Sequence, residues 1–224
     1  MIHCRPAVAE LNLTPTTVYR ELGYGRTTPE PEIQDLASTV LKAVKEVVEP
    51  RGAFLLYTGR VGVAVVELDE GAVLPVGEAL AGMLSGCRRF AVFAATTGDA
   101  YDQLRTAYLG DPVADYVLDG IGNCIVTAVG KFIEQRIAAE VPALRHGSRI
   151  SPGYCGWPLV GQGDIFRLLG DKPCGITLTS SCLMRPLKSI SGIVGIGRDI
   201  RPGGHGCRWC SLDNCARRKG KRHG

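Results

Sequence analysis

The residues best suited to binding a small ligand lie in a short segment that begins at Arg149. Ser151-Pro152-Gly153-Tyr154 follows, and it is typical of a turn because proline fixes φ and glycine can adopt a positive φ. Such a turn would hold the Arg149 guanidinium and the Tyr154 ring in a fixed relation. A planar cation beside an aromatic ring suits a ligand with a carboxylate at one end and a flat ring at the other. The alternative interpretation is an ordinary turn and hairpin in a sheet-containing core.

A second candidate site lies near the C-terminus, where three cysteines follow a C-x2-C-x4-C spacing: Cys207, Cys210 and Cys215. Three thiolates at this spacing suit a tetrahedral zinc site or a [4Fe–4S] cluster that needs one more ligand. The candidates for that ligand are Cys182, which we favour, Cys174 and His205. The alternative interpretation is three reduced cysteines on a flexible basic tail.

The net charge of +4 is unevenly distributed along the chain. From Arg198 onward there are eight Lys or Arg and two Asp or Glu, whereas the first 197 residues carry 18 basic and 20 acidic side chains. We therefore divide the chain into a near-neutral domain, residues 1–197, and a cysteine-rich basic tail, residues 198–224. A basic tail can contact nucleic acid or an acidic partner, but most such tails are simply solvated.

The composition indicates one globular domain with a substantial core. No run of 18 apolar residues is present, and the first residues lack the apolar segment of a secretion signal, so we expect a cytoplasmic protein that does not cross a membrane. Cytosolic thiols stay reduced, which excludes a disulfide framework. Six cysteines outside the cluster are expected mostly to be small buried apolar residues: Cys4, Cys87, Cys124, Cys155, Cys174 and Cys182.

Apolar periodicity predicts the elements that must position these residues. Helices are expected over residues 31–49, 75–84 and, the longest, from Asp111 to about Val141. Strands are expected over residues 53–57, 61–68, 90–95, 176–179 and 190–197, with a break at 184–186. Because helices and hairpin-spaced strands are mixed, the sequence favours an α+β fold: an antiparallel β-sheet flanked by helices, including one long central helix. That helix leads directly to Arg149.

Common catalytic and nucleotide-binding motifs are missing from the sequence. Gly161-Gln162-Gly163-Asp164 lacks both the third glycine and the Lys-Ser/Thr pair of phosphate-binding loops. The chain also has no nucleophile elbow and no zincin pattern. These observations argue against a nucleotide-hydrolysing enzyme, a serine hydrolase or a metalloprotease.

Two motifs together resemble a known family. They are R-x-x-x-G-Y from Arg149 to Tyr154, with C-x-x-P directly after it, and L-T-x-S-x-x-M-x-P-x-x-S-x-S-G from Leu178 to Gly192. This pattern resembles the reactivation domain of cobalamin-dependent methionine synthase, and more closely the short stand-alone members of that family. Further similar segments bring the resemblance to about residues 10–197: Arg20–Tyr24 before Thr28-Pro29-Glu30, Ala94–Gly98 and Leu118–Gly122.

The resemblance implies a function and assigns roles to residues. A domain of this family binds S-adenosylmethionine and presents its methyl group to inactive cob(II)alamin on a catalytic partner, with an electron from flavodoxin or ferredoxin. By resemblance, Arg149 binds the ligand carboxylate, and the backbone around Ser151 and Gly153 lies beside the adenosine. Tyr154 lies between the ligand and cobalamin and is the candidate catalytic residue. The segment that approaches the corrin matches Ser189, Ser191 and Gly192.

The sequence departs from the family at three positions. Ser180 stands where methionine synthase has an acidic residue, and Asn123 and Thr127 fall where the long helix of the family carries acids facing the amino group of the ligand. Neutral side chains hold an ammonium less strongly than carboxylates do. The last strand region of the family is also replaced by the cysteine-rich tail.

We therefore consider two main functional hypotheses. The first is a reactivation subunit for methionine synthase or another corrinoid methyltransferase, a component rather than a complete enzyme. Its cobalamin would be on a partner, because the chain lacks the carrier motif D-x-H-x-x-G. The second is a zinc-binding, iron–sulfur-binding or nucleic-acid-binding accessory module that works through the tail, with nucleic acid the less favoured partner. A redox protein that passes electrons through its cysteines is a third alternative.

The metal hypothesis predicts that anaerobically purified protein contains about one zinc, or about four irons with visible absorbance, per chain. The double change Cys207→Ser and Cys210→Ser should abolish this content, because two ligands are lost. Elemental analysis and an absorption spectrum measure both forms, with Cys124→Ser as the control. Metal-free wild-type protein would contradict the prediction.

Overall fold

The computed structural model describes residues 1–69, 71–198 and 200. One antiparallel sheet dominates it, in the order β4-β3-β2-β5-β9-β6, with β1 also paired to β2. Its strands are β1 Ile2–Cys4, β2 Arg51–Val61, β3 Val66–Leu68, β4 Val73–Leu74, β5 Arg89–Thr96, β6 Arg145–Ile150 and β9 Ser189–Gly197. A separate two-stranded hairpin consists of β7 Thr177–Leu178 and β8 Met184–Arg185.

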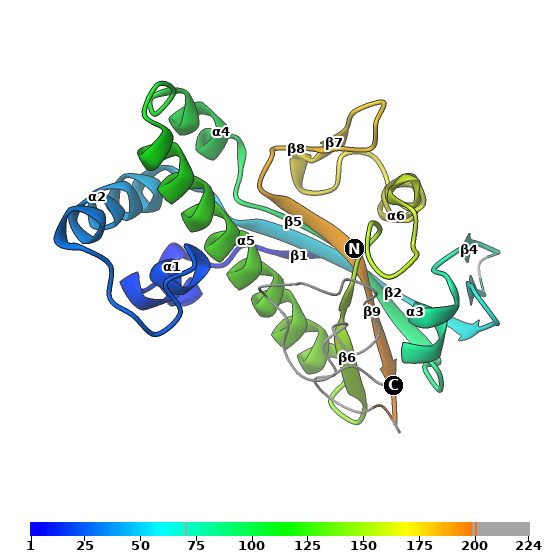
Figure 1. Cartoon of the computed structure of the whole chain (residues 1–224). Helices are drawn as coiled ribbons and strands as arrows, with labels where there is room; N and C mark the ends of the chain where they lie inside the picture. Colours follow the sequence, from blue (N-terminus) through cyan, green and yellow to red (C-terminus); the bar gives the residue numbers. More distant parts are fainter. Residues whose placement is uncertain (70, 199, 201–224) are drawn as a thin grey trace.

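Helices cover both faces of the sheet (Figure 1). The α-helices are α1 Pro15–Glu21, α2 Pro31–Val47, α3 Glu78–Met83, α4 Asp99–Thr106, α5 Pro112–Glu140 and α6 Gln162–Leu169. Short 3-10 helices are η1 Val8–Leu11, η2 Leu159–Gly161 and η3 Pro173–Gly175. The predicted α+β class with one long central helix is confirmed.

The central strand β5 separates two cores because its side chains alternate between the two faces. Phe93 packs with the residues of α1, α2 and α5, whereas Val92 packs with those of α3 and α6. The first core is built largely on α5, which contributes among others Ile125, Ile133 and Ile137. The face with α5 is also the face to which Arg149 belongs, since its register partner Val194 lies in the same core.

The long helix α5 begins and ends within one residue of the prediction. The Asp111 side chain accepts hydrogen bonds from the backbone N–H groups of Val113 and Ala114, at 3.1 and 3.0 Å, and Pro112 occupies the first helical position. Among the described residues, α5 is long and apolar enough to cross a membrane, but 56% of its most apolar 18-residue window is buried inside the fold.

Several element boundaries differ from the prediction. A strand over residues 61–68 is wrong: Val61 ends β2, and the chain turns at Gly62, whose N–H bonds to the carbonyl of Val65 at 2.9 Å. Residues 184–185 were expected to interrupt a strand and instead form β8. The helix over 75–84 shortens to α3 because Pro75 and Gly77 precede its first turn. Sequence patterns also missed α1, α4 and β6.

The expectation that most of the six scattered cysteines are buried is wrong. Cys4 and Cys87 are buried, whereas Cys124, Cys155, Cys174 and Cys182 are half-buried. All six are free thiols in the described part of the chain.

The N-cap of α5 gives a direct test of the fold. Replacing Asp111 with Ala should lower the free energy of unfolding by about 1 kcal/mol, because two N–H groups of the first turn lose their acceptor. Asp111→Asn keeps a capping oxygen and should lie within a few tenths of a kcal/mol of the wild type. Urea unfolding of the three proteins measures the effect, and equal stability of Asp111→Ala and the wild type would contradict the role of the cap.

Candidate functional site

Arg149 lies near the end of the edge strand β6, and its side chain points toward α5. Its guanidinium Nε lies 3.2 Å from Oε1 of Glu134, and both side chains are only about one-fifth exposed, at 20% and 22%. The ladder between β6 and β9 is irregular between His146 and Arg149, and this irregularity sets which face Arg149 occupies. The candidate carboxylate-binding residue is therefore held by a carboxylate of the protein itself.

A glycine of α5 provides the seat for this guanidinium. A Cβ at Gly130 would overlap Nη1 of Arg149 and come within 2.8 Å of the Ile190 side chain. Gly130 and Glu134 are one turn apart on the same helix, so the helix supplies both the space and the counter-charge. Gly130 was not singled out from the sequence, although a glycine inside a long apolar helix is a signal of close packing.

The turn after β6 is confirmed by its hydrogen bonds. Gly153 has a φ of 94° and donates its N–H to the carbonyl of Trp157 at 2.8 Å, and the N–H of Trp157 bonds back to Tyr154 at 2.9 Å. Trp157 is buried and anchors the turn, whereas the Tyr154 side chain is exposed, at 66%. The Tyr154 ring therefore faces solvent, where a second molecule can reach it.

The turn is also in close contact with β9. Gly192 lies against the carbonyl of Ile150, where any side chain would overlap it, and a Cβ there would be 3.0 Å from the Ser151 hydroxyl. The structure thus brings together Ser151 and Gly192, which lie 41 positions apart in the sequence. The absence of a side chain at Gly192 is what allows this approach.

Ser189 and Ser191 point to the other side of the sheet. Because side chains alternate along a strand, Ser189 and Ser191 lie on the same face of β9 as Ile193, which packs in the core containing α6. Both serines are buried. The Ser191 hydroxyl bonds to Oε1 of Gln162, and the Ser189 hydroxyl lies 2.7 Å from the carbonyl of Pro186 and 2.9 Å from Oγ1 of Thr96. These two hydroxyls are already engaged inside the protein, whereas Ile190 and Gly192 of this segment share the Arg149 face.

One stripe of α5 faces this region. At about 3.6 residues per turn, Asn123, Thr127, Gly130 and Glu134 fall within about 60° of one another. Thr127 is exposed, and Asn123 and Glu134 are half-buried. The two positions where the family carries acids therefore do lie on the same stripe as the Arg149 seat, and Glu134 supplies a carboxylate that the sequence interpretation did not identify.

A charged network surrounds Asn123 at the other end of the stripe. Lys188, which is 12% exposed, bonds through Nζ to Oδ1 of Asp119 at 2.6 Å and to Oδ1 of Asn123 at 2.8 Å. The Lys188 side chain packs against Gly122, where an added Cβ would lie only 2.8 Å from the Lys188 Cγ. The Asn123 amide also donates to Glu21 at 3.2 Å. Asn123 is therefore occupied by internal partners.

Two further groups complete this network. Arg105 bonds to both carboxylate oxygens of Asp115, at 2.8 and 2.9 Å, and these hydrogen bonds lower the pKa of Asp115. The Tyr101 hydroxyl donates to the carbonyl of Leu118 at 2.7 Å, and burial raises its pKa well above the usual value. Tyr101 therefore stays a protonated structural donor rather than a base.

A cleft of about 340 Å³ adjoins the stripe, between α5 and the segment from η1 to α1. Thr127 and Lys131 form its rim on α5, and Leu11, Ala128 and Phe132 are among its apolar lining residues. Thr127 belongs to both the stripe and the cleft, so the cleft begins beside the stripe that carries Gly130 and Glu134. Its size and mixed character suit part of a nucleoside-like ligand.

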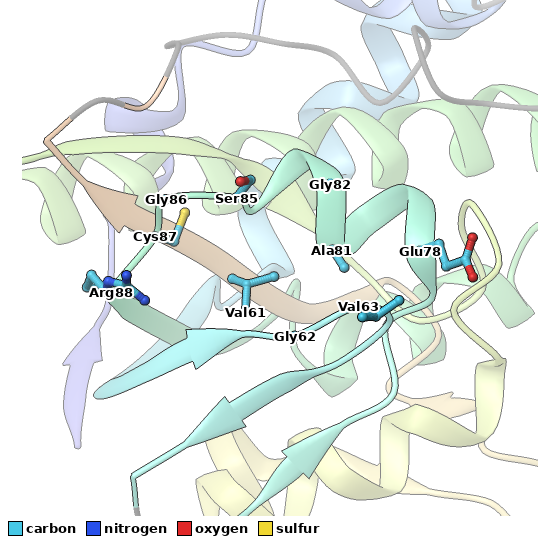
Figure 2. A pocket seen from close by; sticks show the side chains of 10 residues that line it. All are labelled: Val61, Gly62, Val63, Glu78, Ala81, Gly82, Ser85, Gly86, Cys87 and Arg88. Carbon is cyan, nitrogen blue, oxygen red and sulfur yellow. The ribbon is translucent and has the colours of Figure 1, made fainter.

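A second cavity, of about 370 Å³, lies between the end of β2, α3 and the start of β5. Figure 2 shows Arg88 and Glu78 at its opposite ends, with Cys87 beside Gly86 near the Arg88 end. Burial raises the pKa of Cys87 to about 11, so this thiol is protonated and a poor nucleophile at neutral pH. Because none of the family-matched residues lines it, we place the functional site on α5 and not here.

The cysteine cluster, Cys207, Cys210 and Cys215, lies outside the described residues. Cys182 is described: it sits in the turn between β7 and β8 with a φ of 61°, and its N–H bonds to the carbonyl of Thr179 at 2.9 Å. Within the described residues no group of three or more His, Cys, Asp or Glu side chains is arranged to hold a metal ion. The zinc or [4Fe–4S] site stays a prediction.

Comparison with known proteins bears on the fold. No protein-family model matches the chain, and no curated protein matches it. A solved structure, "Crystal Structure of the MetH Reactivation Domain bound to AdoHcy", superposes with a TM-score of 0.65 over 89% of this chain and 79% of that one, at 18% sequence identity. The fold is that of the MetH reactivation domain. At this identity the likeness concerns the fold, and it agrees with the resemblance seen in the sequence motifs.

The seat of Arg149 predicts an unusual response to glycine substitution. Alanine normally stabilises a helix relative to glycine, by up to about 1 kcal/mol, and Gly163→Ala in α6 should do so because nothing lies within 4 Å of its Cβ position. Gly130→Ala should instead lower the free energy of unfolding by about 1–3 kcal/mol, because the methyl group displaces the guanidinium. Urea unfolding measures both effects. Stabilisation by Gly130→Ala would show that the Arg149 guanidinium does not pack against Gly130.

Proposed function

We propose that this protein binds S-adenosylmethionine on the Arg149 face of α5 and serves as a reactivation subunit for a cobalamin-dependent methyltransferase on a separate polypeptide. The observation that carries the proposal is the half-buried Arg149, seated on Gly130 beside the Ser151–Tyr154 turn and the close approach of Gly192. The fold of the MetH reactivation domain, seen there with AdoHcy, supports it.

The site offers what such a ligand needs. The guanidinium suits a carboxylate, since its N–H groups form two parallel hydrogen bonds. The backbone of the turn, held by Trp157, presents a surface beside Ser151 and Gly153 for a flat adenosine. The cleft that begins at Thr127 offers further apolar lining.

The chemistry of this ligand asks little acid–base catalysis from the protein. A sulfonium methyl group is already activated, so the contribution of the protein is to position it. The groups near the site fit that task, because the serines of β9 and Tyr101 are engaged in internal hydrogen bonds. Tyr154 is the exposed ring next to the site and is proposed to lie between the ligand and the corrin.

The proposal includes partners. Methyl transfer to cob(II)alamin also requires one electron, for which we propose flavodoxin or ferredoxin, and the cobalamin would be carried by the methyltransferase partner. The cysteine-rich basic tail is the part of the chain best suited to an acidic electron donor, by charge alone. Because transfer involves a soluble partner and donor, we propose a cytoplasmic location.

Titration calorimetry with S-adenosylmethionine tests the proposal. Arg149→Gln should weaken binding about 10-fold or more, because a charge-assisted hydrogen bond contributes about 1.5–3 kcal/mol. Arg167→Gln is the control, since Arg167 is an exposed arginine that pairs with Asp164 on α6. Saturable binding by the wild type and the control, with loss in Arg149→Gln, is expected. No heat from folded wild-type protein at millimolar ligand would overturn the function.

A further inference from the structure

We infer that Glu134 is a specificity-determining residue, which makes the Arg149 site select ligands whose head group carries both a carboxylate and an ammonium, as an α-amino acid does. The inference rests on the proposed function. It adds a residue and a mechanism of selection: the ion pair between Arg149 and Glu134 is exchanged for two ion pairs with the ligand.

The first step is that Arg149 is not a free cation. Its Nε lies 3.2 Å from Glu134, and a ligand carboxylate must compete for the same guanidinium. The absence of a side chain at Gly130 lets the guanidinium pack against α5 beside Glu134. Binding of a carboxylate therefore draws on the donors that now serve Glu134.

The second step is the position in which this leaves Glu134. Its side chain is only 22% exposed, and a partly desolvated carboxylate without a partner is unfavourable. A ligand that has a carboxylate but no ammonium leaves the Glu134 carboxylate without a partner. A ligand that also brings an ammonium supplies the missing partner, so both protein charges and both ligand charges are neutralised.

The third step is that the other polar groups of the same stripe are poorly suited to the ammonium. The Asp119 carboxylate is paired with Lys188 at 2.6 Å and lies 3.7 Å from Arg105. Asn123 is bonded to Lys188 and Glu21, and Thr127 is uncharged. Glu134 is thus the carboxylate of this stripe that would lose its partner, Arg149, when the ligand carboxylate binds.

A purely structural role for Glu134 predicts that Glu134→Gln affects all carboxylate ligands alike, with or without an amino group. If it only neutralises Arg149, then Glu134→Gln removes a competitor and strengthens the binding of every carboxylate ligand. If it only positions Arg149, then the substitution weakens every carboxylate ligand equally. Selection of the ammonium predicts neither of these. It predicts an effect that depends on whether the ligand has an amino group.

The experiment therefore compares two probes that differ only in that group: S-adenosylhomocysteine and its des-amino analogue. Each is titrated calorimetrically into the wild type, Glu134→Gln and the control Glu140→Gln, which removes an exposed carboxylate at the end of the same helix. The wild type and Glu140→Gln should bind S-adenosylhomocysteine about 10-fold more tightly than the analogue. In Glu134→Gln this preference should fall below about 3-fold.

The outcomes separate this inference from the proposed function. Wild-type protein that binds neither probe overturns the function, and the inference with it. Wild-type binding with a preference that survives in Glu134→Gln overturns the inference alone. If Glu134→Gln fails to fold in a urea titration, Glu134→Asp replaces it, and an unchanged preference for the amino group in that variant, with its shorter reach, counts against the inference.

Discussion

The packing of α5 on the sheet is the constraint on which the rest of the structure depends. Its apolar residues, such as Ile125, Val129 and Ile133, are fully buried against β2, β5 and β9. Its glycines Gly122 and Gly130 interrupt this surface and admit the side chains of Lys188 and Arg149 between helix and sheet. Alanine at either point would displace these side chains, because its Cβ would come within 2.8 Å of them.

Charges drawn into this interface must be neutralised, and α5 supplies the counter-ions. Lys188 meets Asp119 and Asn123, and Arg149 meets Glu134. The two sites differ in their surroundings. Lys188 shares its acceptors with Arg105 and the Asn123 amide in a connected network, which suits a structural joint between α4, α5 and β9. Among the described residues, Arg149 has one ion-pair partner, Glu134, and it lies beside an exposed turn, which suits exchange with a ligand.

The likeness to the MetH reactivation domain at 18% identity shows how loosely this fold constrains its sequence. Burial of apolar residues on the two faces of β5 requires only a suitable alternation, and many sequences provide it. The side chains that would touch a ligand are free to differ. In the proposed site, Asn123 and Thr127 stand where the sequence resemblance places acids, and Glu134 lies a turn or more farther along α5; this would be such a rearrangement on a retained framework.

The sequence by itself determined the α+β class, the limits of α5 and the turn after β6. Each of these depends on neighbouring residues: apolar spacing, the Asp111-Pro112 start and the Pro152-Gly153 pair. The tertiary structure decided which side chains share a face. That Ser151 meets Gly192, that Ser189 and Ser191 point away from Arg149, and that Glu134 pairs with it depend on strand register and helix packing. These contacts join residues far apart in the chain, and local pattern carries no information about them because they exist only once the helix lies on the sheet.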